Sequence, residues 1–139
     1  MEILTRAKPL VRGVAEGEAL VSREPLSFWG GYDHRTGEII DRRHPLVGMR
    51  AAGRILGLPY ARGSSTTTAV LLEALRAGTA PAAILTTGVD TFFALAAIVG
   101  EELFGTAFPV AAVDPRDFEQ LPNGRWLRLE VDGTIYLVR

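Results

Sequence analysis

Residues 62–68 read Arg-Gly-Ser-Ser-Thr-Thr-Thr and join an apolar, strand-like segment to a helix-like one. The pattern predicts a strand within Gly53–Tyr60 and a helix over Ala69–Ala77. Gly63 gives the backbone the freedom to turn sharply between them. Serine and threonine oxygens accept hydrogen bonds from the unpaired N–H groups of a helix's first turn. We therefore expect a cup of N–H donors at the positive end of a helix dipole, with Arg62 beside it.

Such a cup would bind a carboxylate or a phosphate, and it could hold a serine oxygen as an anion. The alternative is a well-capped helix whose extra hydroxyls only face solvent. One hydroxyl is enough for a cap, and five in succession lower helix propensity. That excess favours a binding site over a plain cap.

Short strand-like segments surround this junction. Two of them are apolar throughout, Ala82–Leu85 and Phe108–Val113, and we expect both to be buried on both faces. Ile3–Ala7 and Glu18–Val21 read as further strands, and Pro9 confines its own stretch to a sheet edge or a loop. Two strand–helix–strand passages in succession favour right-handed crossovers and a sheet that is at least partly parallel.

Two helices follow these strands. In the first, leucines recur at helical spacing and Gly78 supplies the left-handed residue that ends it. The second helix follows another strand-to-helix joint, Thr86–Asp90, and Gly105 ends it. Its predicted apolar stripe consists of Phe92, Leu95, Ala96, Val99 and Leu103.

The C-terminal part alternates apolar and polar residues on both sides of Asp132-Gly133. Trp126–Val131 and Thr134–Val138 therefore predict a β-hairpin with a two-residue turn. The predicted fold class is α/β, a layered sheet with two main helices and this hairpin. At 139 residues, we expect a single domain over 1–139.

The loop Leu26–Ile40 contains Phe28, Trp29 and Tyr32, which would form either the edge of the core or a lid over the Gly63 loop. His34 and His44 lie in turn-rich stretches, and we interpret both as solvated loop histidines. A Ser-His-Asp hydrolase is not favoured, because the nucleophile-elbow motif is absent.

Composition excludes several classes of function. A net charge of −1 without aromatic–basic interleaving argues against nucleic acid as a partner. The sequence contains no cysteine, which removes disulfides, thiolate catalysis and protein-ligated iron–sulfur clusters from this chain. No apolar run is long enough to span a membrane and no signal-peptide pattern is present, so we expect a cytoplasmic protein.

Several motifs in one order resemble a known family. They are residues 13–22 (GVAEGEALVS), 26–33 (LSFWGGYD), 36–41 (TGEIID), 44–48 (HPLVG), 62–66 (RGSST) and 78–84 (GTAPAAI). Together they resemble the small, swivel-domain subunit of the aconitase X family, over most of the chain from about Gly13 to Val113. Members of that family are hydro-lyases, and the resemblance implies a swivelling β/β/α fold.

The resemblance also implies roles for the 62–66 loop. Ser64 would be the base that takes a proton from carbon, with Ser65 as the second choice, and both are candidate catalytic residues. Arg62, Gly63 and Thr66 would bind an anionic substrate. The family dehydrates cis-3-hydroxy-L-proline or mevalonate 5-phosphate.

The rest of the active site would come from elsewhere. The resemblance implies a large aconitase X-type subunit that forms a heterodimer with this chain and carries the iron or iron–sulfur cluster. The chain itself would bind no cofactor or metal and would be inactive alone. The alternative is a non-catalytic swivel module that binds an anion or docks a partner.

One stretch departs from the family pattern. Many relatives carry an acidic residue and a proline at the second strand-to-helix joint, whereas Thr86–Phe92 keeps one acid and no proline. The sequence therefore does not decide between cis-3-hydroxy-L-proline and mevalonate 5-phosphate as the substrate. The segment from Glu101 to Val110 looks more like the bacterial hydroxyproline type.

Overall fold

The computed structural model describes residues 1–63 and 65–139, and within them eight strands form one sheet. Their order across the sheet is β1 (Glu2–Arg6), β10 (Thr134–Leu137), β9 (Trp126–Leu129), β3 (Ala15–Val21), β6 (Ile55–Gly57), β7 (Ala83–Thr86), β8 (Val110–Ala112) and β2 (Lys8–Val11). The neighbours β3, β6, β7 and β8 run parallel, and the other pairs are antiparallel. The partly parallel sheet is confirmed, and Pro9 lies in the edge strand β2.

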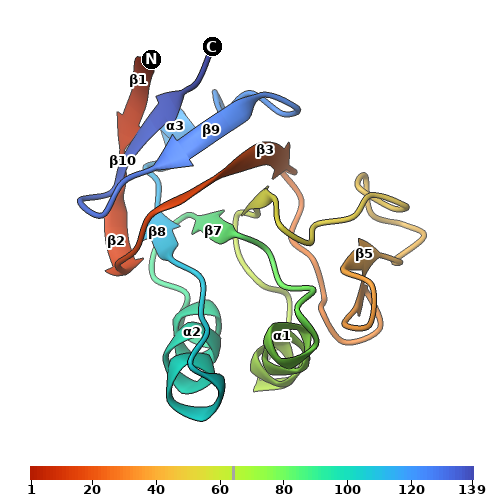
Figure 1. Ribbon diagram of the computed structural model, residues 1–139. Helices are drawn as coiled ribbons and strands as arrows, with labels where there is room; N and C mark the ends of the chain where they lie inside the picture. Colours follow the sequence, from red (N-terminus) through yellow and green to blue (C-terminus); the bar gives the residue numbers. More distant parts are fainter. Residues whose placement is uncertain (64) are drawn as a thin grey trace.

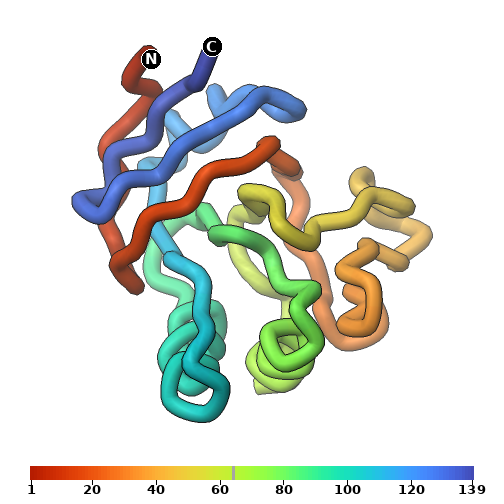
Figure 2. Tube along the Cα trace, viewed as in Figure 1, coloured from red at the N-terminus to blue at the C-terminus, as the bar shows by residue number. Residues whose placement is uncertain are grey.

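The sheet folds over on itself, so that its two halves become two layers. Its end strands β1 and β2 follow one another in the chain with only Ala7 between them. In Figure 1, β1, β10 and β9 lie on one side of β3, and the helices α1 (Ser65–Ala77) and α2 (Thr91–Phe104) lie below β7 and β8 on the other. The tube in Figure 2 shows the same three layers. The resulting β/β/α arrangement confirms the predicted fold class.

Successive side chains of a strand point to opposite faces of the sheet, and this produces two hydrophobic cores. On the parallel strands, residues such as Leu56 and Ile84 point toward the helices, while Ile55 and Leu85 point toward the other half of the sheet. All four are buried. Because both faces of β6, β7 and β8 are covered, their sequences are almost entirely apolar, as is usual for parallel sheets.

The first helix begins earlier than predicted. It starts at Ser65, so three threonines and a serine form its first turn, and Gly78 ends it with a φ of 77°. The predicted strand within Gly53–Tyr60 is shorter than expected and reduces to β6.

The predicted apolar stripe of α2 is wrong except at Ala96. Its buried residues are Phe93, Ala96, Ala97 and Gly100, whereas Leu95 is 41% exposed and Leu103 is 65% exposed. The reason is the close approach of α1: a Cβ built on Gly100 would lie 2.4 Å from Leu75 Cδ1. At this contact a glycine faces α1, while Leu95 and Leu103 face outward and Phe93 is buried.

Of the remaining elements, the predicted C-terminal hairpin is confirmed, whereas a short third helix and a small two-stranded sheet were not predicted. The C-terminal hairpin of β9 and β10 forms, with the turn at Asp132-Gly133. A short helix, α3 (Pro115–Phe118), buries its Phe118 in the hydrophobic core between the two halves of the sheet. Within 26–40, β4 (Tyr32–Asp33) and β5 (Glu38–Ile39) form a small sheet.

The aromatic residues of this loop divide between core and surface. Phe28 stacks on Tyr32 with ring centroids 5.4 Å apart and meets Phe93 edge-on, and all three are buried. Trp29 is 70% exposed. The core-edge interpretation therefore holds for Phe28 and Tyr32 and fails for Trp29.

Among the described residues, none of the helices combines the length and the apolar character that crossing a bilayer requires.

Candidate active site

The candidate site lies where the parallel strands end. β6 leads into the loop that reaches α1, and β7 leads into the loop that reaches α2. Because the carboxyl ends of parallel strands meet at one edge of a sheet, these loops lie together, and such edges are where α/β folds bind ligands. The Thr86 and Thr87 hydroxyls both donate to the Pro59 carbonyl, at 3.0 and 2.8 Å.

Asp90 holds the two loops to each other. Its Oδ1 accepts hydrogen bonds from the N–H groups of Phe92 (3.0 Å) and Phe93 (3.2 Å), which caps α2. Its Oδ2 accepts from the Ala61 N–H at 3.0 Å. Both carboxylate oxygens are thus engaged with backbone, and we assign Asp90 a positioning role for the 61–63 segment.

The hydroxyls of the first turn of α1 have different surroundings. Ser65 and Thr66 are exposed, while Thr68 is buried and donates to the Phe92 carbonyl at 3.1 Å. Thr67 is fully buried, and its Oγ1 has no hydrogen-bond partner among the described residues. A Cβ on Gly63 would lie 3.9 Å from Thr66 Oγ1 and 4.0 Å from Thr67 Oγ1. The two hydroxyls therefore lie next to the open side of this glycine.

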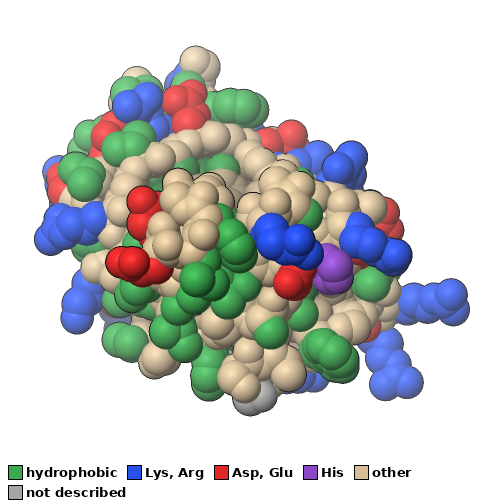
Figure 3. Space-filling model, turned by 60° about the horizontal axis from the view of Figure 1, so that its bottom comes forward, with side chains coloured by type: hydrophobic (Ala, Val, Ile, Leu, Met, Phe, Trp, Pro, Cys, Tyr) green, Lys and Arg blue, Asp and Glu red, His purple; other side chains and the backbone are tan. Residues whose placement is uncertain are grey.

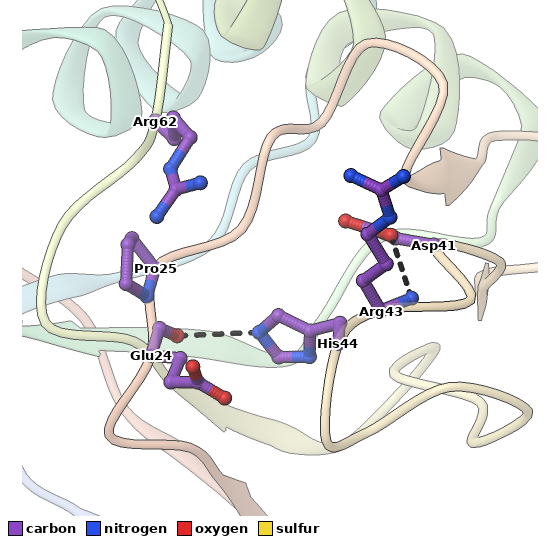
Figure 4. A pocket seen from close by; sticks show the side chains of 6 residues that line it. All are labelled: Glu24, Pro25, Asp41, Arg43, His44 and Arg62. Carbon is purple, nitrogen blue, oxygen red and sulfur yellow. Dashed lines mark hydrogen bonds between the residues drawn. The ribbon is translucent and has the colours of Figure 1, made fainter.

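Two hollows flank the loop. One, which we call the helix-end hollow, has a volume of about 380 Å³ and is lined by Ala61, Gly63, Val89, Asp90, Thr91 and Phe92. The other, the charged hollow, also measures about 380 Å³ and is lined by Glu24, Pro25, Asp41, Arg43, His44 and Arg62. In Figure 4, Arg62 and Arg43 extend toward this hollow from opposite sides. Neither arginine forms an ion pair with any described residue.

The prediction that His44 is a solvated loop residue is wrong. His44 is only 5% exposed. The Leu46 N–H donates to its Nδ1 at 3.1 Å, so Nδ1 is unprotonated and Nε2 carries the hydrogen, which it donates to the Glu24 carbonyl at 3.2 Å. The ring therefore ties two lining segments of the charged hollow together (Figure 4). The local sequence does not predict this burial, because it depends on a contact between His44 and Glu24, which lie twenty residues apart in the chain.

The structure places the other predicted residues as follows. Arg62 lines the charged hollow and Gly63 lines the helix-end hollow. Ser65 and Thr66 are the exposed residues of the first turn of α1, which contains no acidic residue, and neither lines one of the two hollows. Ser64 lies outside the described residues. The sequence analysis missed Asp90, Arg43 and His44 as members of the site.

Metal-binding side chains do not gather in the part of the chain that the structure describes. No group of three or more His, Asp or Glu residues there could hold a metal ion, and the sequence has no cysteine. An iron centre therefore does not fit the described residues of this chain.

Comparison with known proteins assigns the fold to a family. A family model described as the aconitase X swivel domain matches residues 4–137. The chain belongs to the aconitase X family. A crystal structure of aconitase X from Thermococcus kodakaraensis, in its holo-form, superposes with a TM-score of 0.85 at 30% identity, covering 96% of this chain and 97% of that one.

Named relatives of this aconitase X swivel domain are dehydratases. The cis-3-hydroxy-L-proline dehydratase of Pseudomonas aeruginosa is 49% identical over 95% of this chain, which spans 22% of that protein. The same-named protein of Hypocrea jecorina is 38% identical, and the chain again spans 22% of it. The phosphomevalonate dehydratase small subunit of Methanopyrus kandleri is 35% identical, with 94% of each chain covered.

Proposed function

We propose that this chain supplies one side of the active site of a hydro-lyase that dehydrates a small hydroxy acid. Identity to the Pseudomonas protein favours cis-3-hydroxy-L-proline, and mevalonate 5-phosphate is the second candidate. The observation that supports the proposal most is the Arg62-Gly63 segment, which lines two open hollows and leads into the acid-free first turn of α1. A plain helix cap would need neither hollow.

The proposed chemistry is an elimination of water. A serine oxygen of the loop, Ser64 first and Ser65 second, removes the proton from C2 of the substrate. The electron pair of the C–H bond forms the C2–C3 double bond, and the C3–O bond breaks as the hydroxyl takes a proton and leaves as water. A serine is a poor base in water, so its alkoxide needs strong local stabilisation.

The N-terminus of α1 provides part of that stabilisation. Its N–H groups and the positive end of its dipole face the loop, and each preorganised donor contributes about 3 kcal/mol where water is excluded. We propose that Arg62, Gly63 and Thr66 bind the anionic part of the substrate: Arg62 through its charge, Thr66 through its hydroxyl, and Gly63 through its bare backbone.

A larger aconitase X-type polypeptide would complete the site. The chain spans 22% of the two hydroxyproline dehydratases, and other relatives are named small subunits. Because the described residues offer no metal site, we propose that the iron or iron–sulfur centre of the assembled enzyme belongs to that larger part.

An assay of the assembled protein on both substrates tests this proposal. We expect turnover of cis-3-hydroxy-L-proline by the assembly and none by the chain alone. Absence of dehydration of either substrate, with the iron centre loaded, would contradict it.

A non-catalytic anion-binding or docking module is the second candidate, because the chain alone forms the charged hollow with two arginines. That function predicts anion binding by the isolated chain in calorimetry and no turnover in any assembly.

A further inference from the structure

The charged hollow contains two charges of each sign. Among its lining residues, Arg43 and Arg62 carry guanidinium groups and Glu24 and Asp41 carry carboxylates. Within the residues that the structure describes, none of these four groups takes part in an ion pair. A hollow whose charges leave one another unpaired is suited to a ligand that carries both signs.

Asp41 and Arg43 present opposite charges from one turn. Asp41 Oδ1 accepts a hydrogen bond from the Arg43 N–H at 3.0 Å, which ties the carboxylate to the backbone of the arginine. Figure 4 shows this turn across the hollow from Arg62. An α-amino or α-imino acid likewise presents both signs of charge, because its carboxylate and its ammonium group are attached to one carbon.

His44 holds this turn in place. Its ring is buried, accepts from the Leu46 N–H and donates to the Glu24 carbonyl. The residue after Arg43 is thereby attached to the opposite wall of the hollow. His44 is a positioning residue: it fixes the distance between the Asp41–Arg43 turn and the Glu24–Pro25 segment.

We propose that the charged hollow binds the zwitterionic head of an α-imino acid. Arg43 and Arg62 bind the carboxylate, and Asp41, supported by Glu24, binds the ammonium group. This inference rests on the proposed function and narrows its substrate class. Mevalonate 5-phosphate has a carboxylate and a phosphate but no cationic group, so it would bring like charge against Asp41 and Glu24 without compensation.

Calorimetric binding to the assembled protein tests the inference without turnover. L-proline retains both charges and lacks the hydroxyl that leaves, so it is a dead-end ligand. L-prolinamide removes its negative charge and N-acetyl-L-proline removes its positive one. We expect L-proline to bind at least about tenfold more tightly than either analogue, since charge-assisted hydrogen bonds are the stronger ones.

Substitutions assign the two charges to residues. Arg43→Gln should weaken L-proline binding about tenfold and leave L-prolinamide unchanged. Asp41→Asn, whose amide oxygen can still accept from the Arg43 N–H, should weaken L-proline and leave N-acetyl-L-proline unchanged. Arg42→Gln is the matched control, because Arg42 is exposed and does not line the hollow.

Three results would overturn the inference: equal binding of L-proline and both analogues, no effect of Arg43→Gln and Asp41→Asn, or tighter binding of mevalonate 5-phosphate than of L-proline. Failure of the proposed function has a different signature, namely the absence of dehydration whatever the binding results. Binding of L-proline with the predicted charge dependence but without turnover would support the hollow and contradict the enzyme.

Discussion

Asp90 and Gly63 determine the backbone path at the candidate site. Asp90 uses both carboxylate oxygens on backbone N–H groups, and one of these belongs to Ala61. Gly63 has a φ of 122°, a conformation that side chains disfavour. The two residues together place the loop against α2 and leave its outer side open for a ligand.

Gly63→Ala should therefore lower turnover, although its loss of stability should be no larger than that of another glycine with a positive φ. The positive φ costs on the order of 1–3 kcal/mol for a residue with a side chain, and the new methyl group would face the hydroxyls of Thr66 and Thr67. Gly124→Ala is the matched control, because Gly124 also has a positive φ (81°) and lines neither hollow. Urea unfolding should show similar losses in both variants, and the assay should show a loss of turnover only for Gly63→Ala. Equal turnover would contradict the role of this loop.

Tyr32 makes stability fall at alkaline pH. Its phenol is buried and donates to the Thr79 carbonyl at 2.7 Å, and burial raises its pKa. An unfolded tyrosine has a pKa of about 10, so the stabilisation is complete below that pH and is lost as the pH rises above it. Above about pH 10 the free energy of unfolding should fall by up to about 1.4 kcal/mol per pH unit more in the wild type than in Tyr32→Phe. The same pH dependence of the free energy of unfolding in the two proteins would contradict this account.

At the scale of elements, the contact between α1 and α2 depends on small residues. Gly100 faces Leu75, and a Cβ there would also lie 3.0 Å from the Thr106 carbonyl oxygen. An alanine in place of a helical glycine normally stabilises a helix by about 1 kcal/mol. Here we expect the opposite sign, since the backbone oxygen cannot move as easily as a side chain.

Gly100→Ala should accordingly lower the free energy of unfolding by about 1–3 kcal/mol. Thermal or urea unfolding measures it. An exposed position of the same helix, Ile98, supplies the control, because Ile98→Ala should change stability little. A stabilising Gly100→Ala would show that the helices do not approach as closely as the structure indicates.

Local pattern predicted the elements better than their orientation. The C-terminal hairpin follows from alternation and an Asp-Gly turn, both of which are local. The buried face of α2 does not, because Phe92, Leu95, Val99 and Leu103 have the same helical spacing whether they face a core or solvent. Which face is buried depends on tertiary packing, such as the close contact of Gly100 with Leu75 of α1 and of Phe93 with Phe28.

The candidate site was predictable where its residues are consecutive. Residues 62–66 carry their own pattern of glycine, hydroxyls and arginine, and the structure places Arg62 and Gly63 in the walls of two hollows. Arg43, His44 and Asp90 come from other loops. Their proximity depends on the order of β3, β6 and β7 in the sheet, which no local pattern specifies.

At the scale of the whole molecule, the outward face of α2 suits a covering polypeptide. Val89 is 73% exposed and lines the helix-end hollow, and Leu95, Ile98 and Leu103 extend the apolar surface along the helix. Figure 3, which turns the helical side forward, shows hydrophobic side chains gathered there. Val89 belongs both to these exposed apolar residues and to the lining of the helix-end hollow, and most of the length of the hydroxyproline dehydratases lies outside this chain. We therefore expect the larger part of the enzyme to cover this face.

Leu95→Asp should then weaken assembly. Burying an unpaired carboxylate in an apolar contact is unfavourable, so we expect the dissociation constant of the assembly to rise at least about tenfold. Val131→Asp is the control, because Val131 is also half exposed but lies at the turn of the C-terminal hairpin, in the other layer. Sedimentation or surface plasmon resonance measurements compare the dissociation constants of the assemblies that the two variants form. Equal affinities would place the interface elsewhere.

The central claim is that a serine of the 62–66 loop acts as the base in a dehydration. The most direct measurement is the initial rate of cis-3-hydroxy-L-proline dehydration by the assembled protein with Ser64→Ala, beside Ser65→Ala and the exposed control Thr106→Ala. We predict that Ser64→Ala lowers the rate at least about a hundredfold with L-proline binding retained, while Thr106→Ala keeps the wild-type rate. Wild-type rates in both serine variants would contradict the claim.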